Sequence, residues 1–126
     1  MPRFLALEAV LAIHYDQINT FGGSHGLRDQ GLLESALGPA RQTFDYTDGI
    51  YQAAAQYCVS LAKNHPFVDG NKRTASDSML TFLVLNGIEP TLTSGQLFDW
   101  TLRVAIGTLK RPGLAKLLRE NSRDKR

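Results

Sequence analysis

The stretch from Gly49 to Asn64 constrains the fold most, because it predicts a helix that is apolar on most of its sides. After the glycine it reads IYQAAAQYCVSLAKN, with a run of alanines near its start. Alanine has the highest helix propensity of all residues, and a helix that is apolar all round has to be covered by other elements. We therefore expect residues 49–64 to form the central helix of the domain.

The rest of the chain has apolar residues at spacings of three and four, which is typical of amphipathic helices. Gly38-Pro39 is expected to end one helix, and residues 40–48 lose the helical pattern, which favours a loop or a small β-hairpin. No alternation of strands with helices is visible, so the sequence predicts an all-α fold. We expect one domain over residues 1–126 with six helices, at 4–21, 30–37, 49–64, 71–86 and 94–108 and, as a basic C-terminal helix, over 110–126.

The chain is close to neutral, with 14 Lys and Arg against 12 Asp and Glu and a formal net charge of +2. Dedicated nucleic-acid binders carry a basic face, so no direct, specific nucleic-acid binding is expected. Half of the basic residues lie in 110–126, and the preceding chain is acidic. We expect the basic residues of the last helix to form a solvated face.

At 126 residues and 43% hydrophobic content, the chain is long enough to bury a core without covalent cross-links. No apolar run approaches the roughly 18 to 20 residues that cross a bilayer, and the N-terminus lacks the pattern of a secretory signal. We therefore expect a cytoplasmic protein that does not contact the membrane. Cys58 is the single cysteine and lies among apolar residues, which predicts a buried thiol.

The segment His65-Pro66-Phe67-Val68-Asp69-Gly70-Asn71-Lys72-Arg73 concentrates polar chemistry where a loop opens a helix. The start of a helix presents unpaired N–H groups and the positive end of the helix dipole, and so binds phosphate. Two cations in a first turn oppose the dipole unless an anion binds there. The sequence thus predicts a phosphate cradle at the start of this helix, with Gly70, Lys72 and Arg73 as its parts.

Two further residues of this segment suit phosphate chemistry. Asp69 can hold Mg²⁺ through one carboxylate, with water and phosphate oxygens completing the shell. His65 can act as a general base, because an imidazole is partly neutral near pH 7. Each residue also has a structural alternative, namely a helix cap for His65, a turn for Asp69-Gly70 and a solvated first turn for Lys72 and Arg73.

The segment resembles the Fic motif, and more closely the Doc (death-on-curing) toxin branch of the Fic superfamily. Matching landmarks extend over roughly residues 7–88 and include His14, Ile18, Gly22-Gly23, Gly26, Arg28-Asp29, Gly31, Leu33–Leu37, His65–Ala75 and Asn86-Gly87. The resemblance implies a Fic-like helical bundle. It also implies that His65 deprotonates a protein hydroxyl, which then attacks a phosphate of ATP, with Asp69 as the Mg²⁺ ligand and Gly70 to Arg73 on the phosphates.

Two departures separate the chain from Fic proteins that transfer AMP. Those proteins usually have Gly where this chain has Lys72, and a second Arg where it has Ser76. Doc toxins share the Asn71-Lys72-Arg73 form and are similar to kinases, transferring the γ-phosphoryl group to a threonine of elongation factor Tu and blocking translation. The resemblance therefore implies the toxin of a type II toxin–antitoxin system that uses ATP and Mg²⁺.

The resemblance also implies a flap and a partner. Residues 40–48 correspond to the Fic flap, which aligns an extended target segment by strand addition. An inhibitory Ser/Thr-x-x-x-Glu-Gly/Asn motif is missing, because Lys116 stands four residues before Glu120. We therefore expect inhibition by a separate Phd-like antitoxin whose disordered segment folds on the toxin.

Two alternatives stay open at this point. The first is an AMP transferase that uses the same His65 base. The second is a non-catalytic binding module that contacts RNA or the ribosome through the basic tail. P-loop and Rossmann enzymes are excluded, because neither G-x-x-x-x-G-K-[ST] nor G-x-G-x-x-G occurs.

Overall fold

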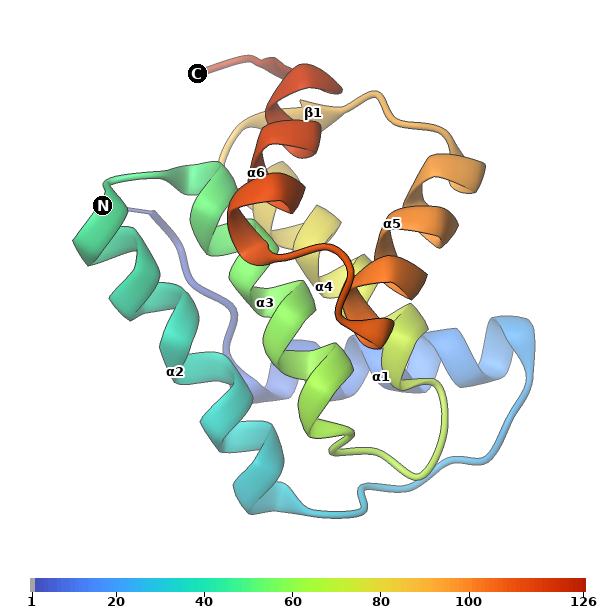
Figure 1. The fold of residues 1–126 in the computed structure, drawn as a ribbon. Helices are drawn as coiled ribbons and strands as arrows, with labels where there is room; N and C mark the ends of the chain where they lie inside the picture. The colour runs from blue at the N-terminus through green and yellow to red at the C-terminus, as the bar shows by residue number, and fades with distance from the viewer. Residues whose placement is uncertain (1) are drawn as a thin grey trace.

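Six helices and one small sheet form the chain in the computed structural model, which describes residues 2–126 (Figure 1). The expected all-α fold with six helices is confirmed. In chain order the elements are α1 (Leu7–Phe21), α2 (Gln30–Thr47), α3 (Ile50–Asn64), α4 (Asn71–Leu85), β1 (Ile88–Pro90), α5 (Ser94–Ile106), α6 (Arg111–Glu120) and β2 (Ser122–Asp124).

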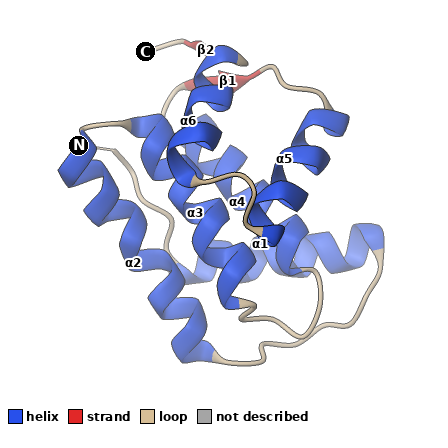
Figure 2. Ribbon diagram, in the orientation of Figure 1, coloured by secondary structure: helices blue, strands red, loops and turns tan. Residues whose placement is uncertain are grey.

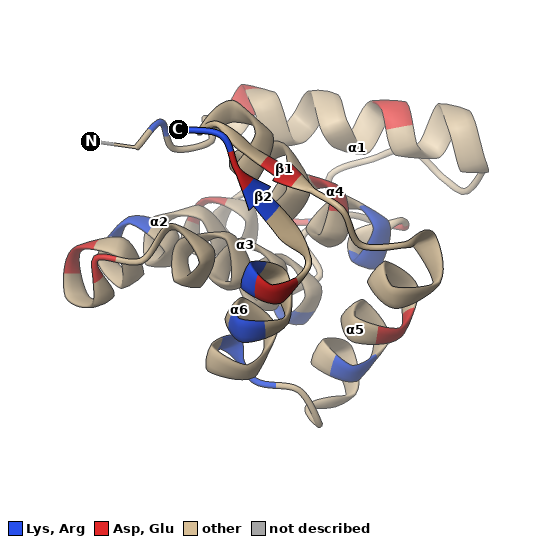
Figure 3. Ribbon diagram, turned by 90° about the horizontal axis from the view of Figure 1, so that it is seen from above, with Lys and Arg blue, Asp and Glu red and all other residues tan. Residues whose placement is uncertain are grey.

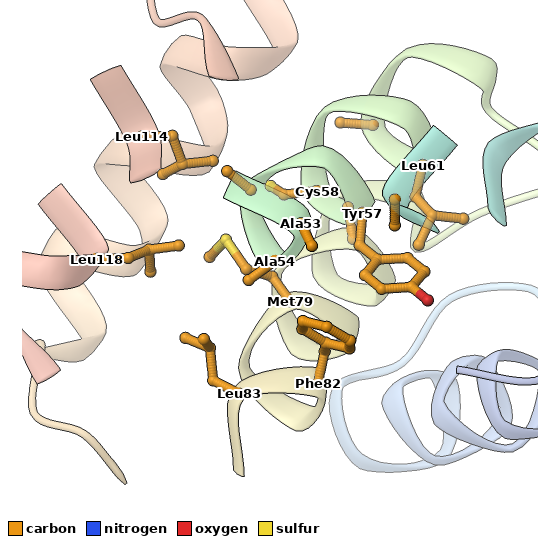
Figure 4. Close-up of a cluster of buried hydrophobic side chains, with 14 of the residues drawn as sticks. Ala53, Ala54, Tyr57, Cys58, Leu61, Met79, Phe82, Leu83, Leu114 and Leu118 are labelled. Atoms are coloured by element: carbon orange, nitrogen blue, oxygen red, sulfur yellow. The ribbon is translucent and has the colours of Figure 1, made fainter. Parts of the chain in front are cut away.

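Helix α3 lies at the centre, as predicted, with α2, α4, α5 and α6 packed around it. Its alanines are fully buried and have small side chains, so the neighbouring helices can approach closely. Figure 4 shows side chains from α3, α4 and α6 meeting in one cluster, with Met79 and Phe82 of α4 on one side of α3 and Leu114 of α6 on another. Cys58 is buried in this core, as expected.

The prediction of a short helix over 30–37 followed by a loop or flap at 40–48 is wrong. Helix α2 runs through Pro39 to Thr47 without a break. Its buried residues Leu33, Ala36, Ala40 and Thr43 are spaced three and four apart and face α3. Proline fits the helical φ and removes one helical hydrogen bond. Burial of a continuous apolar face outweighs that loss, so the helix continues.

The predicted basic helix over 110–126 is too long. Helix α6 ends at Glu120, and β2 pairs antiparallel with β1, with Glu89 opposite Arg123 (Figure 2). Glu89 forms ion pairs with both Arg123 and Lys125, and Figure 3 shows basic β2 beside an acidic position of β1. Ile88 of β1 is 2% exposed and belongs to the hydrophobic core. Arg123 and Lys125 of the basic tail therefore help to dock the C-terminus on β1.

No helix within residues 2–126 is both long and apolar enough to cross a membrane. The loop between α1 and α2 runs beside the loop between α3 and α4 at the end of the molecule away from both termini (Figure 1). An isolated bridge joins Leu27 of the first loop to Phe67 of the second. This pairing brings the predicted motif together with residues some forty positions earlier in the chain.

Candidate active site

All six predicted site residues line one cleft of about 750 Å³. Helix α1, the loop after α3, the start of α4 and helix α5 form its walls. The volume lies in the range of small-molecule sites. The structure therefore gathers His65, Asp69, Gly70, Asn71, Lys72 and Arg73 around a single space.

The start of α4 opens onto this cleft as an anion site. Gly70 is the N-cap, with φ at 74°, and no side chain caps the helix. Within residues 2–126 the N–H groups of Asn71, Lys72 and Arg73 have no acceptor. The first turn contains two cations and no acid. Unpaired N–H groups, the helix dipole and two positive charges all favour a bound phosphate.

His65 ends α3 in a left-handed conformation, with φ 49° and ψ 54°. This conformation costs a residue with a Cβ roughly 1–2 kcal/mol, so the surrounding contacts have to hold it. The side chain is exposed and lies in the cleft wall. Its imidazole makes no hydrogen bond within residues 2–126, and so it can accept a proton from a ligand.

Asp69 is fixed by two backbone N–H groups. Its Oδ1 accepts from Gly70 N at 2.8 Å and its Oδ2 accepts from Ser24 N at 3.2 Å. These hydrogen bonds, that from Gly70 first, lower the pKa of the Asp69 carboxyl. The group is therefore ionised at neutral pH, with lone pairs left for a further ligand.

Asn71 holds the motif loop with its side chain. Its Oδ1 accepts from Phe67 N and its Nδ2 donates to Phe67 O, both at 2.9 Å. Asn71 therefore offers its backbone N–H to a phosphate in the predicted cradle, and its side-chain amide fixes the loop.

The two cations of the first turn differ in their surroundings. Arg73 donates to the carbonyl of Gly22 at 2.9 Å and lies 5.8 Å from the centroid of the Phe21 ring. Lys72 is exposed and has no ion pair within residues 2–126. Arg73 therefore ties the α1–α2 loop to α4, and Lys72 is the cation free to meet a ligand.

His14 belongs to the site although sequence reasoning gave it no role. The side chain is buried, and the pairing of His14 with Asp69 joins α1 to the motif loop at 2.8 Å, Nε2 to carbonyl oxygen. Since a carbonyl only accepts, Nε2 carries the proton. Burial lowers the pKa of His14. The signal in the sequence was a lone histidine on the buried face of α1, two turns after which Gly22 ends the helix.

Helix α5 contributes an apolar wall that the sequence did not flag. Phe98 and Leu102 lie one helical turn apart, line the cleft and are 72% and 39% exposed. Phe21 of α1 lines the same cleft and is 67% exposed. The cleft thus combines a cationic end with an apolar, uncovered side.

A family model described as the Fic/DOC family matches residues 4–83, which takes in α1 to α3, most of α4 and the whole motif. The chain belongs to the Fic/DOC family. It is 34% identical over 119 residues to the protein named Protein kinase doc from Escherichia phage P1, covering 93% of this chain and 94% of that relative. It is 43% identical over 72 residues to the protein named Toxin Doc from Mycolicibacterium smegmatis, covering 55% of each.

The match to the phage relative extends past the family model, over most of this Fic/DOC chain, including helices that residues 4–83 leave out. The resemblance read from the motif is therefore confirmed at the level of the family. The motif itself lies inside the matched range, in the loop and helix that form the anion site.

Proposed function

We propose that this chain transfers the γ-phosphoryl group of ATP to a Ser or Thr hydroxyl of a protein, with elongation factor Tu as the target, and so blocks translation as the toxin of a type II toxin–antitoxin system. The observation that carries the proposal is the open N-terminus of α4, with Lys72 and Arg73 in its first turn and His65 and Asp69 in the same cleft. The similarity to a relative named Protein kinase doc supports it.

The reaction needs one base and a fixed phosphate. His65 takes the proton from the acceptor hydroxyl, whose oxygen attacks the γ-phosphorus. The bond from the γ-phosphorus to the bridging oxygen breaks, and ADP leaves. The N–H groups of α4 and the cations Lys72 and Arg73 hold the phosphates and balance their charge, which is most of what phosphoryl transfer requires.

The donor set fits a magnesium ion that arrives with the nucleotide. Within residues 2–126 no group of three or more His, Cys, Asp or Glu side chains gathers to hold a metal by itself. One ionised carboxylate, that of Asp69, stands beside the anion site. Mg²⁺ is commonly held by one or two carboxylates, phosphate oxygens and water. When bound, it neutralises negative charge on the phosphates.

Phosphoryl transfer is favoured over AMP transfer by the residues at two positions. Lys72 places a cation in the first turn, and Ser76 donates to the carbonyl of Arg73 at 3.0 Å instead of offering a second guanidinium. Lys72 binds phosphate as a point charge, whereas a second arginine at position 76 would add a bidentate clamp to Arg73. The anion site is therefore built for fewer contacts than an AMP-transferring motif makes.

The partner we propose is an antitoxin with a segment that folds on binding. The uncovered Phe21, Phe98 and Leu102 line the cleft and offer apolar surface to such a segment. A segment that folds into a helix on binding places apolar side chains one helical turn apart in such an apolar groove. A bound antitoxin would also restrict access to the cleft.

The mass of elongation factor Tu after incubation with the chain, ATP and Mg²⁺ tests the activity. We expect the mass of elongation factor Tu to rise by about 80 Da, the mass of a phosphoryl group, whereas transfer of AMP would add about 329 Da. His65→Ala should slow the addition by roughly 10²- to 10⁴-fold. An AMP-sized addition would replace the proposal by AMP transfer. Growth arrest that survives His65→Ala would favour a non-catalytic binding module.

A further inference from the structure

Helix α3 ends without the backbone closure that helices usually have. The residue after His65 is Pro66, which has no N–H to donate. Within residues 2–126, the N–H of the cap residue His65 also makes no hydrogen bond back into α3, whereas the cap residues of the other five helices do. The carbonyls at the end of α3 need another donor.

The Arg28 side chain supplies that donor. Its Nε and one terminal nitrogen donate to the His65 carbonyl at 2.8 and 2.6 Å, and the same nitrogen donates to the Asn64 carbonyl at 3.1 Å. A planar guanidinium can satisfy adjacent acceptors in this way, whereas an ammonium cannot reproduce the fork. One side chain thus caps α3 and holds the backbone of His65 through its carbonyl.

The backbone around Arg28 is itself fixed against the motif loop. Its N–H and that of Asp29 donate to the Pro66 carbonyl at 2.7 and 3.0 Å, and Val68 N donates to Gly26 O at 3.0 Å. Asp29 also caps α2 by accepting from Leu32 N at 3.0 Å. The guanidinium therefore projects from an anchored turn, and its position is transmitted to His65.

We infer that Arg28 is a positioning residue for His65, and this inference rests on the proposed function of His65 as the base. The hydrogen bonds that Arg28 donates to its carbonyl hold the backbone of His65 in the left-handed conformation. Without those hydrogen bonds the backbone relaxes to the extended region, which a residue with a Cβ prefers when proline follows it. The imidazole then leaves the position from which it reaches the acceptor hydroxyl, while the anion site of α4 stays intact.

The first test reads the backbone directly in the full-length chain. NMR chemical shifts and scalar couplings of isotope-labelled protein report whether His65 keeps a positive φ. We expect Arg28→Ala to lose it, Arg28→Lys to keep it in part, and Arg119→Ala to leave it unchanged. Arg119 is a matched control because its guanidinium packs over the Tyr51 ring, outside the cleft. A positive φ retained in Arg28→Ala overturns the inference, whatever reaction the chain catalyses.

The second test measures phosphoryl transfer from ATP to elongation factor Tu. We expect Arg28→Ala to lower kcat by roughly tenfold or more and to leave the KM for ATP within about twofold, since only the base is displaced. In a His65→Ala background the Arg28→Ala change should cost nothing further. An equal loss in both backgrounds would overturn the inference. If His65→Ala alone left the rate unchanged, the proposed function would fail instead, and the NMR result would still decide the role of Arg28.

Discussion

The imidazole of His14 lies flat on the ring of Phe67, with 3.8 Å between the ring centroids and 6° between the planes. The pair joins α1 to the middle of the motif loop, and the same imidazole donates to the Asp69 carbonyl. Phe67 is in turn held by Asn71 at its backbone. The loop that carries Asp69 is thus packed on one side by α1 and fixed on the other by α4, so its geometry is set before a nucleotide binds.

His14→Ala should destabilise the chain and weaken the site together. The change removes a hydrogen bond with a net contribution of about 1 kcal/mol and a ring stack of about 1 kcal/mol. We expect the free energy of unfolding, measured by urea denaturation, to fall by roughly 2 kcal/mol. His14→Phe keeps the stack and loses the hydrogen bond, so its free energy of unfolding should lie between those of wild type and His14→Ala. Equal stability of wild type and His14→Ala would show that neither the stack nor the hydrogen bond contributes.

Pro39→Ala should stabilise the chain, because α2 is continuous at this position. Alanine restores one helical hydrogen bond and removes the clash of the proline ring with the preceding turn, in a setting where interior proline costs about 3 kcal/mol. We expect the free energy of unfolding to rise by roughly 1–2 kcal/mol. Pro112→Ala is the control, since Pro112 lies in the first turn of α6, where proline is tolerated. A loss of stability in Pro39→Ala would argue against a continuous α2.

The error at Pro39 shows where sequence reasoning stops. The helical signal of α3 was strong because it rests on local composition, and the motif was visible because its residues are contiguous. Helix α2 depends on burial of Ala40 and Thr43 against α3, which a local reading of Gly38-Pro39 could not weigh. The same holds for β2, whose partner β1 lies more than thirty residues earlier.

The candidate site likewise has a part that the sequence predicts and a part that only the fold reveals. Residues 65–73 were found from their spacing, and all the predicted site residues line the cleft. Arg28 and His14 act through the backbone of the motif loop, and only tertiary contacts show which carbonyls they reach. Phe98 reads as an ordinary apolar position of an amphipathic helix, and its exposure follows from the packing of α5.

The ion pairs of Glu89 should make the docking of β2 depend on pH. The hydrogen bond and charge of Lys125, followed by the charge of Arg123, lower the pKa of Glu89 below its ordinary 4.5 in the folded chain. Because the folded value lies below the unfolded one, this contribution to stability is complete above about pH 4.5 and is lost as the pH falls through the folded value.

Glu89→Gln should therefore lower the melting temperature slightly at pH 7, and the difference from wild type should shrink as the pH falls well below 4.5. Circular dichroism melts from pH 7 to pH 3 check this. The side chains are exposed, so about 1 M salt should also reduce the difference. A difference that stays constant across this range would mean that packing, and not charge, is lost in the variant.

Lys72→Ala should weaken nucleotide binding without affecting the fold. Lys72 is exposed in the first turn of α4, beside the unpaired N–H groups, and has no ion pair within the described chain, 2–126. Loss of one charged contact to phosphate is worth about tenfold or more in affinity. We expect isothermal titration calorimetry to show that decrease for ATP with Mg²⁺, and Lys72→Arg to recover much of it. Lys63→Ala, at the exposed end of α3, is the matched control for loss of one charge. Unchanged affinity in Lys72→Ala would remove Lys72 from the phosphate site and leave the N–H groups and Arg73 to hold the anion.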